Sequence, residues 1–158
     1  MLEIKAPNEP IIGTLTLLET RIFLAGSIEM GVAEMWQDRI ARDLSHEDVV
    51  IFNPRRDDWD SSWEQKASNP QFAEQVNWEL DHIDTADIVI FYFDPGTKSP
   101  VTLMELGYVI GQGCAVEIIV CCPDGFWRKG NVEIMCDRNN ITLVNTYEEL
   151  VEEIRDYL

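Results

Sequence analysis

The 158-residue chain is long enough for one domain with its own core, and its 46% hydrophobic content excludes a disordered or fibrous protein. Its formal net charge is -17, from 12 Lys and Arg against 29 Asp and Glu, which argues against binding nucleic acid or an anionic membrane, because phosphate binding needs clustered cations. No apolar run is long enough to span a bilayer, and the N-terminus lacks the pattern of a signal peptide, so we expect one cytoplasmic domain over residues 1–158.

After a loose arm over residues 1–19, apolar runs alternate with helical patterns along the chain. The apolar runs predict five buried strands, at residues 21–27, 48–54, 87–93, 115–122 and 141–144. Between and after them we expect helices around 33–44, over 70–85, from Ser99-Pro100 onward, around 130–138, and after a capping box at Thr146 and Glu149. Apolar rather than alternating strands indicate a sheet covered on both faces. We therefore predict an α/β fold, a flavodoxin-like doubly wound five-stranded parallel sheet.

The cysteines favour packing over chemistry. Four are present, and no C-x-x-C pair occurs: Cys114, Cys121, Cys122 and Cys136. His46 and His82 lie far from them in the sequence, and we expect both at the surface. The pattern indicates reduced core cysteines and no metal site.

Unusual residues collect where the predicted strands end. In doubly wound sheets, ligands bind beyond the carboxyl ends of the strands. The residues that fall there and could contact a ligand are Gly26 and Ser27 after the first strand, Asp58 and Trp59 after the second, and Asp94 and Ser99 after the third.

Two glutamates sit on or beside apolar helical faces. Glu79 follows Val76 by three positions, and Glu105 follows Val101 by four, so both point toward packed surfaces. Burying an unpaired carboxylate costs several kcal/mol, roughly. Each glutamate could cap a neighbouring loop or pair with an arginine of NPRR at 53–56. Alternatively, two carboxyls in different environments suit glycosyl chemistry, with one ionised nucleophile and one group that handles protons.

Several neighbouring residues leave alternatives open. Arg55 and Arg56 could bind a phosphate or neutralise nearby aspartates. Trp59 and Trp63 could stack on a base or anchor their loop. Gly26-Ser27 could bind phosphate at a helix N-terminus, but the glutamate at 29 and the lack of a nearby cation favour a nucleoside over a nucleotide.

Three motifs, FLAGSIEMG, NPRRDDWD and FDPGTKSPVTLMELG, together resemble the nucleoside 2-deoxyribosyltransferase family. The resemblance covers about residues 21–145, in the right order and on the expected elements. It implies that Glu105 is a nucleophile that attacks the anomeric carbon of a 2'-deoxynucleoside and holds a covalent deoxyribosyl ester. Glu79 matches an acidic residue near the base, and Asp58 and Trp59 match a loop that contacts the base. Asn131 matches an asparagine that reaches the neighbouring subunit's site, which implies a homo-oligomer.

The chain departs from the family pattern at two positions. Phe23 stands near where some members have a tyrosine that orients the nucleophile; Tyr92 and Tyr108 are candidates to replace it. Ser99 stands where well-studied members have an aspartate that holds the sugar hydroxyls, and Asp94 is the candidate replacement.

The expected substrates are 2'-deoxynucleosides and free nucleobases, with no metal or organic cofactor. Two alternatives remain: an N-glycoside hydrolase of nucleosides or their monophosphates that uses the same glutamate, and a non-catalytic nucleotide-sensing module on the same fold.

Overall fold

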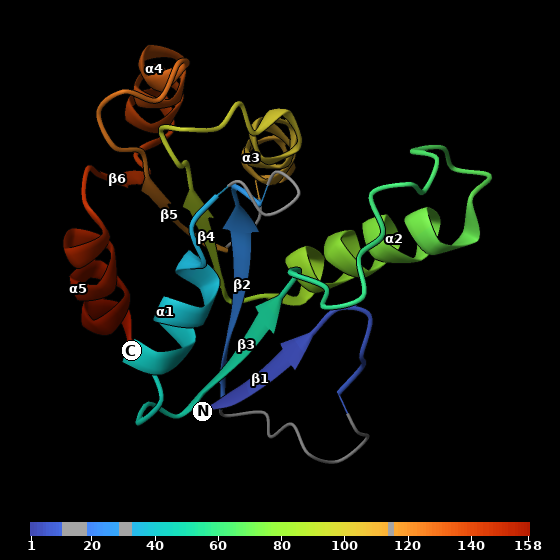
Figure 1. Ribbon diagram of the computed structural model, residues 1–158. Coiled ribbons are helices and arrows are strands. Elements are labelled where there is room, and N and C mark those ends of the chain that lie inside the picture. Colours follow the sequence, from blue (N-terminus) through green and yellow to red (C-terminus); the bar gives the residue numbers. More distant parts are fainter. Residues whose placement is uncertain (11–18, 29–32, 114–115) are drawn as a thin grey trace.

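A computed structural model describes residues 1–10, 19–28, 33–113 and 116–158 (Figure 1). Its centre is one parallel sheet with strand order β1-β3-β2-β4-β5-β6. The strands are β1 (Leu2–Lys5), β2 (Thr20–Gly26), β3 (Val49–Asn53), β4 (Ile88–Tyr92), β5 (Glu117–Cys121) and β6 (Thr142–Val144). The helices are α1 (Trp36–Asp43), α2 (Pro70–Thr85), α3 (Pro100–Gln112), α4 (Lys129–Asn139) and α5 (Tyr147–Tyr157).

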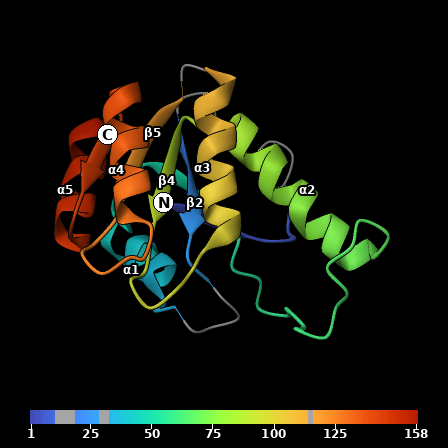
Figure 2. The ribbon, with the colours of Figure 1, turned by 90° about the horizontal axis from the view of Figure 1, so that it is seen from above.

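Helices cover both faces of the sheet, as the apolar strands predicted (Figures 1 and 2). Successive residues of a strand point to opposite faces. Phe23 of β2 therefore packs in one core with residues of α2, α3 and α4, whereas Leu24 packs in the other with α1 and α5. The α/β class with helices on both faces of a parallel sheet is confirmed.

The predicted count of five strands is wrong, because the sheet has six. The additional strand, β1, lies at the start of the stretch expected to be a loose arm, and it pairs in parallel with β3 at the edge of the sheet. It has only four residues, of which Ile4 alone is buried. So short and half-exposed a strand leaves no apolar run to detect in the sequence.

Local signals placed several helix ends correctly. The Asn69 side chain accepts hydrogen bonds from the backbone N–H groups of Gln71 and Phe72, and Pro70 begins α2. Thr146 and Glu149 form the predicted capping box of α5. None of the helices in the described ranges is long and apolar enough to cross a bilayer.

Candidate active site

A cluster of three buried hydroxyls joins the carboxyl ends of β2 and β4, where the order of the strands reverses. Ser27 Oγ lies 2.9 Å from Thr97 Oγ1 and 2.6 Å from Ser99 Oγ, and the last two are 2.8 Å apart. The Asp94 backbone N–H also donates to Ser27 Oγ, at 2.9 Å. This crevice is where doubly wound sheets bind their ligands. The predicted residues Ser27, Asp94 and Ser99 therefore meet at one point.

These contacts shape the loop that begins α3. Both Asp94 carboxylate oxygens accept backbone hydrogen bonds, from Gly96 N at 2.7 Å and Glu34 N at 3.2 Å. Ser99 is the N-cap of α3 and has a positive φ of 44°, a conformation that is strained for a residue with a side chain. Its buried hydroxyl contacts hold that turn, which fixes where α3 starts and so where Glu105 lies.

Glu105 and Glu79 form an acid pair across α3 and α2. Glu105 is 8% exposed, and burial, followed by the nearby charge of Glu79, raises its pKa to about 8. Burial also raises the pKa of Glu79 to about 7, opposed by a hydrogen bond from Gln75. Because the two groups interact, these values belong to the pair. Near neutral pH the pair therefore holds about one proton between two carboxyl groups.

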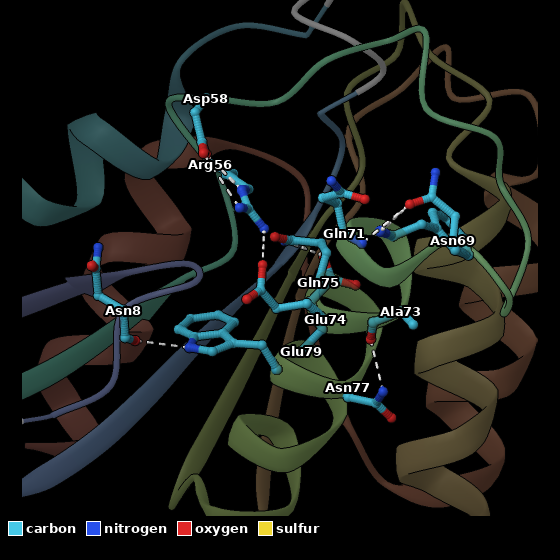
Figure 3. Close-up of polar contacts among 12 residues, drawn as sticks. Asn8, Arg56, Asp58, Asn69, Gln71, Ala73, Glu74, Gln75, Asn77 and Glu79 are labelled. Atoms are coloured by element: carbon cyan, nitrogen blue, oxygen red, sulfur yellow. Dashed lines mark hydrogen bonds and ion pairs between the residues drawn. The ribbon is translucent and has the colours of Figure 1, made fainter.

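Neither arginine of the NPRR segment neutralises this pair. Arg56 forms ion pairs with Asp58 at 2.6 Å and Glu74 at 2.8 Å, as Figure 3 shows. Arg55 is buried and donates to the Glu34 carbonyl and to Gln37 Oε1, both at 3.1 Å. Among the described residues, the structure records no hydrogen bond or ion pair to the Glu105 carboxylate. The alternative in which each glutamate pairs with an NPRR arginine is therefore wrong for Glu105 and Glu79.

The loop between β3 and α2 lies beside the N-terminal half of α2 (Figure 1). Its two tryptophans contact each other edge to face, with ring centroids 5.2 Å apart, and Arg56 lies 5.1 Å from the Trp63 ring. Asp58 is exposed and held by Arg56. Arg56 pairs with Glu74 of α2 and so holds the loop that carries Asp58 and Trp59 against this helix.

Other predicted residues lie outside this cluster. Asn131 is exposed in the first turn of α4. Gly26 allows close packing, because an added Cβ would come within 2.6 Å of both Trp36 Cζ2 and the Tyr92 carbonyl oxygen. Tyr92 packs in the core of the opposite sheet face, and its hydroxyl donates to Glu34 at 2.8 Å. Tyr108 donates to Asp84 at 2.9 Å. Neither tyrosine is recorded bonding to Glu105.

Sequence analysis missed Gln75. It lies one turn before Glu79 on α2, is 4% exposed, and donates from Nε2 to the Pro54 carbonyl at 2.8 Å and to Glu79 Oε1 at 2.9 Å. The four-residue spacing to Glu79 was the available signal, since such neighbours meet on a helix.

The cysteines and histidines take no part in the acid pair. Cys121, Cys122 and Cys136 are buried and unpaired by disulfides, whereas Cys114 lies outside the described residues. The surface position expected for His82 is wrong: it is 6% exposed and stacks on Trp78. The described ranges contain no group of three or more His, Cys, Asp or Glu that could hold a metal ion.

Two hollows, of about 300 and 290 Å³, lie along β1, the residues after it and the end of α2. Neither is lined by Glu79 or Glu105. Both hollows lie at the edge of the sheet near β1, away from the carboxyl ends of β2 and β4 where the hydroxyl cluster lies.

Comparisons with known proteins show the family and the fold of the chain. A sequence model of the family described as nucleoside 2-deoxyribosyltransferase-like matches residues 19–126, which include every strand from β2 to β5. The fold also resembles the crystal structure of a conserved protein from Enterococcus faecalis V583, with a TM-score of 0.61 and 13% identity, over 89% of this chain and 99% of that one. No curated protein matches the sequence.

Proposed function

Because the chain belongs to the nucleoside 2-deoxyribosyltransferase-like family, we propose that it exchanges the base of 2'-deoxynucleosides through a covalent deoxyribosyl ester of Glu105. The observation that carries this proposal is the interaction of the buried Glu105 with the half-buried Glu79, neither of which has a cationic partner among the described residues. Unpaired buried carboxyls are costly for stability and are typical of acid–base and nucleophilic sites.

In the first step, a Glu105 carboxylate oxygen attacks the anomeric carbon as the bond from that carbon to the base nitrogen breaks. The electron pair of the breaking bond goes to the base, which takes the proton of Glu79 and leaves as a neutral molecule. In the second step, an acceptor base attacks the ester, its N–H proton goes to Glu79, and Glu105 is released as a carboxylate. Two displacements at one carbon retain its configuration.

A pair that shares one proton supplies both the carboxylate nucleophile and the proton donor. In the free protein the Gln75 hydrogen bond favours the charge on Glu79. A base nitrogen bound beside Glu79 would favour the proton there, and the charge would then fall to Glu105. Substrate binding therefore places the proton with the leaving base and the charge with the nucleophile.

We propose roles for the remaining residues from the family resemblance and from their places at the carboxyl ends of the strands. Ser27 after β2, with Asp94 and Ser99 after β4, is proposed to hold the sugar beside α3, and Gly26 allows the close packing of β2 that places Ser27 there. Asp58 and Trp59, on the loop beside α2, are the residues proposed to contact the base. Asn131 on α4 is proposed to reach the site of a second copy in a homo-oligomer.

Chromatography of 2'-deoxyinosine incubated with the protein, with and without free cytosine or adenine, tests the proposal. We expect a new deoxynucleoside that forms only with an acceptor base and is absent with Glu105→Ala. Hypoxanthine and deoxyribose released equally without an acceptor would identify a hydrolase instead. No turnover of this substrate, of deoxythymidine or of deoxynucleoside monophosphates would contradict catalysis and favour a sensing module.

A further inference from the structure

Gln75 links the end of β3 to the acid pair. Its Nε2 donates to the carbonyl of Pro54, just after β3. It also donates to Glu79 Oε1 on the next turn of α2 (Figure 3). The side chain is buried, so these contacts are shielded from water. A glutamine amide has two N–H donors, and both are used here.

The two contacts fix which way the amide points. A peptide carbonyl such as that of Pro54 can only accept a hydrogen bond, so the Gln75 nitrogen, and not its oxygen, must face it. The second N–H of the same nitrogen then faces Glu79 Oε1. The cost falls on Gln75 Oε1, which is buried with no hydrogen-bond partner among the described residues. An unsatisfied buried acceptor costs about 1–3 kcal/mol, so stability alone does not favour this arrangement.

The orientation has a consequence for the proton of Glu79. An oxygen that accepts an N–H hydrogen bond from Gln75 is a poor place for a proton, because two hydrogens would then face each other. A protonated Glu79 therefore carries its proton on Oε2. The amide thus leaves one defined oxygen of Glu79 as the proton donor.

We propose that Gln75 is a positioning residue that directs the transferable proton of Glu79 to Oε2, and thereby toward the leaving base. This inference rests on the transferase function proposed above. Two further acidic groups face this part of α2: Glu105 on α3, whose pKa is raised by burial and then by the charge of Glu79, and Glu74 of α2 itself, which is paired with Arg56 of the preceding loop. Arg56 is engaged by both Glu74 and Asp58. Among the described residues, the recorded hydrogen-bond donor to Glu79 is therefore Gln75 and not an arginine.

A purely structural role for Gln75 makes a different prediction. If the amide only tied α2 to the β3 loop, its loss would slow every substrate by the same factor. If it positions a proton, its loss should matter only where the leaving base needs that proton. A matched substrate pair separates the two roles: 2'-deoxyinosine needs protonation to leave, whereas the base of 7-methyl-2'-deoxyinosine is already cationic and leaves without it.

The test measures kcat/KM on both substrates for Gln75→Met, with Asn77→Leu as the control amide on the exposed side of the same helix. We expect Gln75→Met to lose roughly 10- to 100-fold on 2'-deoxyinosine, within the range for general acid catalysis, and less than about threefold on the methylated substrate. Asn77→Leu should change neither. Equal losses on both substrates, or no loss, would overturn the proposal. Gln75→Asn keeps the amide but shortens its reach, and it should show the same substrate dependence if the methionine variant does not fold.

Carbon-13 NMR titration of the glutamate carboxyls gives a readout that does not depend on turnover. In Gln75→Met the pKa of Glu79 should rise, because a donor to its charged form is lost. An unchanged Glu79 titration would overturn the positioning role. If the wild-type protein turns over neither substrate, the transferase proposal itself fails, and the titration alone then supports or overturns the effect of Gln75 on Glu79.

Discussion

The polar groups near the core are paired differently on the two faces of the sheet. On the face covered by α1 and α5, hydroxyls at the edge of the core meet carboxylates: Tyr92 donates to Glu34 at 2.8 Å and Tyr147 donates to Asp43 at 2.6 Å. On the face covered by α2 and α3, burial and the charge of Glu79 raise the pKa of Glu105, and the Gln75 amide is the recorded hydrogen-bond donor to the pair among the described residues. The first arrangement stabilises the fold, whereas the second opposes it.

This difference separates structural from functional burial. A hydroxyl that donates to a part-exposed carboxylate lowers the energy of both groups, by about 1 kcal/mol. Burial raises the pKa of both Glu105 and Glu79, and the charge of Glu79 adds to the rise at Glu105, so this pair instead stores electrostatic energy in the folded state. Proteins tolerate such stored energy mainly where activity requires it. Substitutions in the acid pair on the α2–α3 face should therefore lower activity and raise stability. Substitutions of the paired polar groups on the α1–α5 face should lower stability and leave activity unchanged.

The largest expected effect is on transfer by Glu105→Gln. Glutamine nearly preserves shape but cannot act as the nucleophile, so base exchange should fall at least about a thousandfold. Single-turnover assays with 2'-deoxyinosine and adenine measure this loss. Glu152→Gln, on the exposed side of α5, is the control and should keep full activity. Residual exchange above one hundredth of wild type would show that another group forms the covalent bond.

The pH dependence of the wild-type protein should follow the pair. Turnover needs one carboxylate and one proton, so kcat/KM should be greatest between about pH 7 and 8, where the pKa values of Glu79 and Glu105 lie. Below that window both groups are protonated and the nucleophile is lost; above it both are ionised and the proton donor is lost. Each limb should fall by about tenfold per pH unit. A profile that stays flat from pH 5 to 9 would contradict a shared proton.

The acid pair should also make the stability of the folded protein depend on pH, because it destabilises the fold when it is ionised. The pKa of Glu105 is raised in the folded state from 4.5 to about 8, so the folded protein binds more protons than the unfolded chain in that interval, and stability falls as pH rises through it. Glu105→Gln removes this loss. At about 1.4 kcal/mol per pKa unit, the rise from 4.5 to about 8 corresponds to about 5 kcal/mol, so the variant should be more stable than wild type by up to about that much at pH 9, and close to it at pH 4.5. Urea unfolding at both pH values checks this, and a variant less stable at pH 9 would mean that Glu105 has a structural partner.

Most of the fold was predictable because local signals agreed with it. Apolar runs gave β2 to β6, and capping residues such as Asn69 and Thr146 gave the starts of α2 and α5. The missing strand, β1, is stabilised by its neighbour β3 rather than by its own sequence. A short edge strand depends on tertiary pairing, which periodicity does not report.

The candidate site was predictable in its acids but not in their environment. Helical spacing placed Glu79 and Glu105 inward, since it depends only on the period of the helix. Helical spacing could not predict that Ser27 contacts Thr97 and Ser99, which follow it by some 70 residues. It also could not predict that the Gln75 amide is buried against the Pro54 carbonyl. Nor could it show that His82 is covered by the residues around Trp78. Such contacts arise from the packing of separate elements, and no local pattern encodes them.

The smallest expected effect belongs to the other face of the sheet. Tyr147→Phe removes the hydroxyl that donates to Asp43 and keeps the ring over which the Arg39 guanidinium lies, 3.7 Å from its centroid. Stability should fall by about 1 kcal/mol, the value of one hydrogen bond to a part-exposed carboxylate. Base exchange should stay within twofold of wild type, since Tyr147 packs on the side of the sheet opposite the acid pair. Urea unfolding and the exchange assay measure both quantities on one preparation. A loss of exchange without a loss of stability would show that the α1–α5 face acts on the reaction, and the division of labour between the faces would then be wrong.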